Sequence, residues 1–184
     1  MIFRNTDIQG AFVVEIEPKD DERGFFARGF CRKEFEAHGL NTDVAQANIG
    51  MSRLRGTLRG LHYQIGPHEE TKLVRCTAGA VFDAIVDLRS CSPSYKKWLG
   101  VELTAENHRM IYVPEGCAHG YLTLADNTEV FYLVSRSYSA GAERGVRWND
   151  PAFAMHWPLM ERVVISDKDA SWPDWSDNSH PHAS

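Results

Sequence analysis

The 184-residue sequence has no apolar run that approaches the roughly 20 residues of a membrane span. Its first residues, MIFRNTDIQG, contain no apolar stretch long enough for a signal peptide. It has only four cysteines, and none of them sits in a C-x-x-C pair or a regular framework, which favours a reducing compartment. We therefore expect a soluble, cytoplasmic protein with no membrane partner.

The sequence also lacks an excess of basic residues. Its 20 Lys and Arg against 25 Asp and Glu give a net charge of −5. A surface that follows phosphates usually needs a basic excess, so nucleic acid is not an expected partner. A small anionic ligand remains compatible, because it requires only a local cluster of Arg and Lys. The hydrophobic content of 43% is ordinary for a globular protein with a real core.

Short strands dominate the predicted secondary structure. A strand over 11–17 precedes the charged loop PKDDERG, and one short helix over 32–40 is expected to end at a glycine. Beyond it, turn signals such as PEG and ADN separate segments rich in β-branched and aromatic residues. Many short strands at this spacing predict an all-β sandwich or barrel of jelly-roll type. The remaining strands are expected over 44–50, 57–65, 71–77, 80–88, 97–104, 109–113, 119–124, 128–138 and 145–148.

The end of the sequence is polar and rich in Pro and Ser. Residues 1–175 are expected to form a single jelly-roll domain, and residues 176–184 a disordered tail. The histidines His180 and His182 fall in this tail, so we do not expect them to be ligands.

Several predicted strands have one apolar face and one mixed face. Alternation in the stretch 55–65 places His62 and Gln64 on one face, and Leu61 and Tyr63 on the other. If the apolar faces pack between two sheets, the mixed faces are solvated; if the sheet closes into a barrel, they line its lumen. His and Tyr on these faces, in place of Lys, Glu and Ser, favour the lumen. The corresponding side chains on three further strands are Lys72, His119 and Tyr132.

The stretch PEGCAH (114–119) has the form P-x-G-x-x-H and resembles the second motif of the cupin superfamily of small jelly-roll barrels. Many cupins bind a transition metal through an H-x-H pair, a glutamate and the histidine of this motif. Here the pair reads His-Tyr-Gln over 62–64, so its second histidine is missing. His62 and His119 alone are too few ligands for a catalytic metal site. No metal is expected, and a metal-dependent cupin oxygenase is the alternative from another enzyme class.

Six motifs lie in order along the sequence: RGLHYQ (59–64), KLVR (72–75), DLRSCSP (87–93), PEGCAHGYLTL (114–124), WNDP (148–151) and SDKD (166–169). Together they resemble the dTDP-4-dehydrorhamnose 3,5-epimerases, a metal-free cupin branch that acts on nucleotide-linked 4-keto sugars. The resemblance implies a double-stranded β-helix (jelly-roll, cupin-like) barrel with a few short helices. It also implies a homodimer whose N-terminal strands pair across the interface. The implied activity inverts carbon 3, carbon 5 or both of a dTDP-4-keto-6-deoxyglucose-type sugar in deoxysugar biosynthesis, without a cofactor.

The resemblance assigns four catalytic side chains. A 4-keto group acidifies the hydrogens on carbons 3 and 5, so inversion needs a base on one face and an acid on the other. His62 matches the base. An imidazole titrates at about pH 6.5, so it can accept a proton at neutral pH and give it up again. Asp169 matches the carboxylate that pairs with this histidine. Tyr132 matches the acid that reprotonates the opposite face, and Lys72 the cation near the keto oxygen.

Further matches surround the substrate. The forked donors of the arginines suit a diphosphate, and the aromatic residues match positions around the sugar and the base. Surface ion pairs and a solvated loop remain the alternative for the charged members of this set. The implied substrate contacts are Arg23, Phe26, Arg28, Gln46, Asn48, Arg59, Lys72, His119, Tyr138, Glu143 and Lys168.

The sequence departs from the family pattern at two places. Arg28, near the nucleotide, stands where the family typically has a glutamate, which leaves open the identity of the base, with CDP- and GDP-linked sugars as alternatives. The segment HEETKLV (68–74) differs from the more usual glutamine-glycine ahead of the lysine. Inversion at carbon 3 alone also remains open. A sugar-nucleotide binding protein without catalysis is a further alternative, and the intact set of base, acid, cation and carboxylate argues against it.

Overall fold

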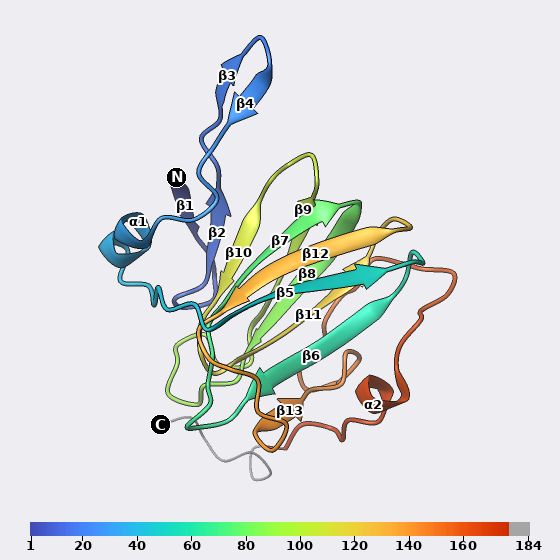
Figure 1. The fold of residues 1–184 in the computed structure, drawn as a ribbon. Helices are drawn as coiled ribbons and strands as arrows, with labels where there is room; N and C mark the ends of the chain where they lie inside the picture. The colour runs from blue at the N-terminus through green and yellow to red at the C-terminus, as the bar shows by residue number, and fades with distance from the viewer. Residues whose placement is uncertain (177–184) are drawn as a thin grey trace.

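Two antiparallel sheets make up the body of the computed structural model, which describes residues 1–176 (Figure 1). In spatial order the six-stranded sheet is β1 (Ile2–Asn5), β2 (Phe12–Glu15), β10 (Met110–Val113), β7 (Lys72–Ala78), β12 (Thr128–Val134) and β5 (Gln46–Ser52). The five-stranded sheet is β13 (Glu143–Gly145), β6 (Leu58–Gln64), β11 (Cys117–Thr123), β8 (Ala80–Asp87) and β9 (Trp98–Thr104). The predicted all-β jelly-roll class is confirmed.

The strands predicted from residue 44 onward are all present, with ends displaced by a few residues. The largest overestimate is the strand predicted over 128–138, because β12 ends at Val134. The structure adds a hairpin, β3 (Lys19–Asp21) and β4 (Gly24–Phe26), where the sequence predicted a charged loop. All six of its residues are exposed, so no apolar face marks these strands in the sequence. Figure 1 shows this hairpin projecting away from the two sheets.

The mixed strand faces point inward, as the barrel interpretation predicted. Val74, Ile85 and Val130 from these faces meet in a buried cluster between the two sheets. The opposite, apolar faces are not solvated, because chain segments outside the sheets cover them. Residues after β13 cover Leu61 and Tyr63, and the helix α1 (Arg32–Ala37) covers the outer face of β7 and β10.

The only other helix in the described chain is α2 (Asp167–Ala170), a single turn beside β6. No helix among residues 1–176 is long and apolar enough to cross a membrane. Apart from Ser176, the predicted tail of 176–184 lies outside the described residues, as do His180 and His182.

Candidate active site

One end of the space between the sheets is a cavity of about 350 Å³. Its wall comes from β5, β7 and β12 of the larger sheet, from β6 and β13 of the smaller one, and from the loops beside them. The lining residues are Gln46, Asn48, His62, Tyr63, Gln64, Glu70, Lys72, Tyr132, Val134, Tyr138 and Glu143. Seven of the sequence-predicted site residues thus share one cavity.

The base and acid candidates enter this cavity from opposite sheets. His62 comes from β6, whereas Lys72 and Tyr132 come from the neighbouring strands β7 and β12 of the facing sheet. Lys72 and Tyr132 are inward-pointing residues of strands paired in register, so both side chains reach the same space. A ligand in the cavity would therefore lie between a histidine and a tyrosine.

Asp169 holds the His62 ring. Its Oδ1 lies 2.7 Å from Nε2 of His62, and its Oδ2 accepts a 3.2 Å hydrogen bond from the Gly60 N–H. The Ser166 side chain caps α2 by accepting the Asp169 N–H, which fixes the carboxylate beside β6. Burial raises the pKa of Asp169, but the hydrogen bonds and the adjacent histidine outweigh it and lower the pKa overall. The carboxylate is therefore held in its charged form.

A second His–Asp pair lies beside the first, because His119 of β11 is the register partner of His62. Nε2 of His119 lies 2.9 Å and 3.0 Å from the two oxygens of Asp83. Asp83 is fully buried, and this burial raises its pKa against the opposing effects of His119 and Lys72. Sequence reasoning missed Asp83, although alternation in β8 places it on the inward face with Val81.

Two glycines let the two histidine strands approach closely. A Cβ on Gly60 would lie 2.6 Å from Cα of Gly120, and one on Gly120 would lie 2.6 Å from the carbonyl oxygen of Arg59. Gly60 also has a φ of +123°, which favours glycine. The RGLH and HGY segments thus owe their glycines to the contact between β6 and β11.

A polar network closes the rim of the cavity. The Tyr138 hydroxyl donates to Oε2 of Glu143 at 2.7 Å, and Nζ of Lys168 lies 2.6 Å from the same oxygen. Burial raises the pKa of Glu143, and the bonds from Lys168 and Tyr138 outweigh it and lower the pKa overall. The backbone N–H of Tyr138 donates to the side chain of Gln46 on β5. The rim therefore links both sheets to the loop before β13.

Arg59 lies nearby on β6. It donates to the Ser52 hydroxyl and to the Met51 carbonyl. Burial raises the pKa of Tyr132, and the charge of Arg59 opposes this rise only in part.

Three predicted substrate contacts lie away from the cavity. Arg23 pairs with Asp21 within the exposed β3–β4 hairpin. Phe26 and Arg28 line a separate cavity of about 240 Å³, where Arg28 lies 3.5 Å from Glu34. Within one chain these three residues do not reach the site.

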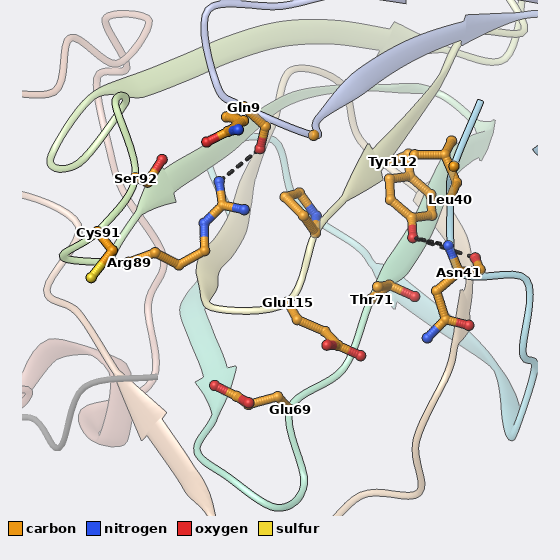
Figure 2. A pocket seen from close by; sticks show the side chains of 13 residues that line it. Gln9, Leu40, Asn41, Glu69, Thr71, Arg89, Cys91, Ser92, Tyr112 and Glu115 are labelled. Atoms are coloured by element: carbon orange, nitrogen blue, oxygen red, sulfur yellow. Dashed lines mark hydrogen bonds between the residues drawn. The ribbon is translucent and has the colours of Figure 1, made fainter. Parts of the chain in front are cut away.

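A larger cavity of about 500 Å³ lies elsewhere and is built differently (Figure 2). Arg89 lines this cavity, and its guanidinium donates to both oxygens of the buried Asp87 and to the Gln9 carbonyl. The two glutamates that line it, Glu69 and Glu115, repel each other, and burial together with this repulsion raises the pKa of Glu69. The residues that line it include no histidine that could act as a base.

The polar side chains do not fit a transition metal. Nε2 of His62 and Nε2 of His119 each contact a carboxylate. Gln64 hydrogen-bonds to Glu70, to the His68 carbonyl and to the Ser139 N–H. Within residues 1–176, no group of three or more His, Cys, Asp and Glu side chains is placed to hold a metal ion.

Known proteins are similar to this chain in sequence and in fold. Residues 5–177 match the family model described as dTDP-4-dehydrorhamnose 3,5-epimerase. An epimerase of that name from Sinorhizobium fredii is 42% identical over 94% of this chain and 89% of its own. The Elizabethkingia anophelis epimerase structure gives a TM-score of 0.94 at 37% identity, over 98% of this chain and 99% of that one. A Legionella pneumophila epimerase in complex with dTDP-4-keto-L-rhamnose gives 0.87 at 38% identity, over 93% and 90%. The chain therefore belongs to the dTDP-4-dehydrorhamnose 3,5-epimerase family, as its six motifs indicated.

Proposed function

We propose that this chain inverts carbon 3, carbon 5 or both of a dTDP-linked 4-keto-6-deoxy sugar in deoxysugar biosynthesis of the rhamnose type. The observation that carries this proposal is that His62 and Tyr132 line one cavity from opposite sheets. Inversion needs this arrangement, because the proton leaves from one face of the carbon and returns to the other. The complex of the Legionella relative supports the class of substrate.

The proton transfers follow from the side chains of the cavity. His62 takes the proton from the carbon beside the keto group, and the C–H electron pair moves to the keto oxygen to form an enolate. Asp169 engages Nε2, so the proton goes to Nδ1 and the carboxylate stabilises the imidazolium. The Lys72 ammonium stabilises the enolate oxygen. Tyr132 then gives its hydroxyl proton to the opposite face, and solvent restores both side chains.

The rest of the substrate would extend toward the rim and beyond it. Tyr138, Glu143 and Lys168 form a hydrogen-bonded group at the mouth of the cavity, which suits the base and ribose of the nucleotide. Gln46 and Asn48 of β5, and His119 beside His62, would contribute polar contacts to the sugar. Arg59 would approach the diphosphate.

We further infer a homodimer in which the β3–β4 hairpin of each copy reaches the cavity of the other. Among the residues that line the cavity, Lys72 is the sole lysine or arginine, which is little charge for a diphosphate. The hairpin presents Arg23 and Phe26, the latter 73% exposed, to a neighbour, with Arg28 following them. On the edge strand β5, Ile49 is 67% exposed, as suits an interface. Sedimentation equilibrium tests this inference, and a fully active monomer would contradict it.

We also place the enzyme in the cytoplasm. All four cysteines carry free thiols, which supports a reducing compartment. The cysteines Cys76 and Cys117 are buried in the core between the sheets and act there as small apolar residues.

The test is incubation with dTDP-4-keto-6-deoxyglucose in deuterated water. Epimerase action places deuterium on carbon 3, carbon 5 or both, and mass spectrometry with NMR identifies the carbons. A His62→Ala variant should lose exchange by roughly a hundredfold or more, because general-base catalysis contributes about 10²–10⁴. His62 has a side chain 31% exposed, so the variant is expected to stay folded.

The proposal would be overturned if the parent protein placed no deuterium on the dTDP-linked sugar and none on CDP- or GDP-linked sugars. Normal exchange by the folded His62→Ala variant would show that another group is the base.

A further inference from the structure

The assigned acid–base set leaves one carboxylate of the cavity without a role. Glu70 lies in the loop between β6 and β7, and its side chain is 10% exposed. Its Oε1 lies 2.9 Å from Nζ of Lys72, whose side chain is equally buried. Its Oε2 accepts a 3.1 Å hydrogen bond from Nε2 of Gln64. Both oxygens are therefore held by groups of the cavity wall.

The preceding residue provides a contrast. Glu69 lines the other, larger cavity, opposite Glu115 (Figure 2). Two consecutive carboxylates of one loop thus face different cavities. Only Glu70 lies where its charge acts on the groups that would handle the enolate.

The charge of Glu70 acts on the acid as well as on the cation. Burial raises the pKa of Tyr132, the negative charge of Glu70 raises it further, and Arg59 opposes this effect. A phenol that holds its proton more firmly is a weaker acid at the pH of the reaction. At the same time the ion pair offsets part of the positive charge that Lys72 directs into the cavity.

We propose that Glu70 is a positioning residue that acts through Lys72 and Tyr132 and sets how often the enolate is reprotonated on the Tyr132 face. This inference rests on the proposed epimerase function. The enolate has two fates. Return of a proton from His62 regenerates the starting configuration, whereas transfer from Tyr132 gives the inverted product. A negative charge in the same cavity as Tyr132 disfavours the second fate, because it opposes formation of the phenolate that the transfer leaves behind.

The ratio of the two fates isolates the effect on Tyr132. Release of Lys72 alters the formation of the enolate, which both fates share, so it changes the overall rate more than the ratio. In deuterated water, return from His62 appears as deuterium in recovered starting sugar, and transfer from Tyr132 appears as deuterated inverted sugar. Their ratio does not depend on the amount of folded enzyme.

The decisive variant is Glu70→Gln, which removes the charge and keeps the shape. Glutamine has the shape of glutamate and keeps a side-chain oxygen that can accept a hydrogen bond, so the variant is expected to fold. The ratio of deuterated inverted sugar to deuterated starting sugar should rise roughly two- to fivefold, as expected for a stronger general acid. Ultraviolet titration of tyrosinate, with Tyr132→Phe as the blank, should show Tyr132 ionising at a lower pH in Glu70→Gln than in the parent.

Two controls complete the test. Glu70→Asp keeps the charge and should retain a ratio and a tyrosine titration close to those of the parent. Glu69→Gln removes the neighbouring charge, which faces the other cavity, and should change neither. If Glu70→Gln exchanges with the parental ratio and Tyr132 titrates at the parental pH, the inference is wrong. If the parent itself exchanges no deuterium with dTDP-, CDP- or GDP-linked sugars, the proposed function fails, and the tyrosine titration still decides whether Glu70 acts on Tyr132.

Discussion

Two His–Asp pairs lie side by side on neighbouring strands, and only His62 of the first pair lines the cavity that also holds Lys72 and Tyr132. His62 is partly open to the cavity, with a side chain 31% exposed, whereas His119 is almost closed off at 8%. The pKa values of their carboxylates are also shifted in opposite directions. Contacts with an N–H, a hydroxyl and the ring lower the pKa of Asp169, whereas burial dominates at Asp83 and raises its pKa.

A histidine and an aspartate therefore have a different chemical role in each pair. A carboxylate that stays charged can hold an imidazole in one tautomer and stabilise the imidazolium that forms during turnover. A carboxylate whose charge is opposed by burial serves mainly as a buried hydrogen-bond partner. What separates the two pairs is access to the cavity and the number of donors around the carboxylate, and this difference can be tested.

The largest expected effect is on turnover. Asp169→Asn removes the charge that orients His62, and we expect deuterium exchange to drop on the order of 100-fold. Asp83→Asn, the matched change in the second pair, should lower exchange by less than about tenfold, because the proposed base is His62 and not His119. Steady-state exchange assays on both variants measure the comparison. Equal losses in the two variants would remove the distinction between the pairs.

A change in the contact between the two strands should act on both pairs at once. In Gly120→Ala the new Cβ would lie 2.6 Å from the carbonyl oxygen of Arg59 and 3.0 Å from Cα of Gly60. These atoms belong to the backbone, so β6 and β11 must move apart, at an expected cost of about 1–3 kcal/mol in the free energy of unfolding. Urea unfolding gives this value. Gly141→Ala, at a glycine with nothing within 4 Å, is the control, and equal stabilities would contradict the steric argument.

Alternation along the strands was enough to predict much of the cavity wall. It placed His62, Lys72 and Tyr132 on inward faces, because side chains on a strand repeat with a period of two. The motif resemblance added Asp169, which lies in a one-turn helix far from β6 in the sequence and which periodicity alone would not connect to it.

The residues that were missed have a different origin. Glu70 lies in a loop, where no periodicity fixes the direction of a side chain. Asp83 stands in the apolar strand β8, and the histidine that pairs with it comes from another strand. The hairpin of β3 and β4 was missed because its strands carry charged residues and bury neither face. Side-chain pairing across strands depends on register, which a single sequence does not specify.

The smallest effect expected is on the pH dependence of stability, and it should have opposite signs in the two pairs. Asp169 has a lowered pKa in the folded state, so its stabilisation is present above the usual carboxyl range and is lost as the pH falls through the folded value. Asp83 has a raised pKa, so its contribution is greatest at low pH and is lost as the pH rises toward the folded value.

Asparagine at each position removes the titration. Relative to the parent, Asp169→Asn should become less stable as the pH rises toward the usual Asp pKa of about 4, whereas Asp83→Asn should become more stable as the pH rises above that value, each by about 1 kcal/mol. Urea unfolding at a series of pH values gives both curves. Curves that run in parallel would mean that the two carboxylates experience the same environment. Opposite slopes would tie the difference in proton chemistry to the donors around Asp169 and the burial of Asp83.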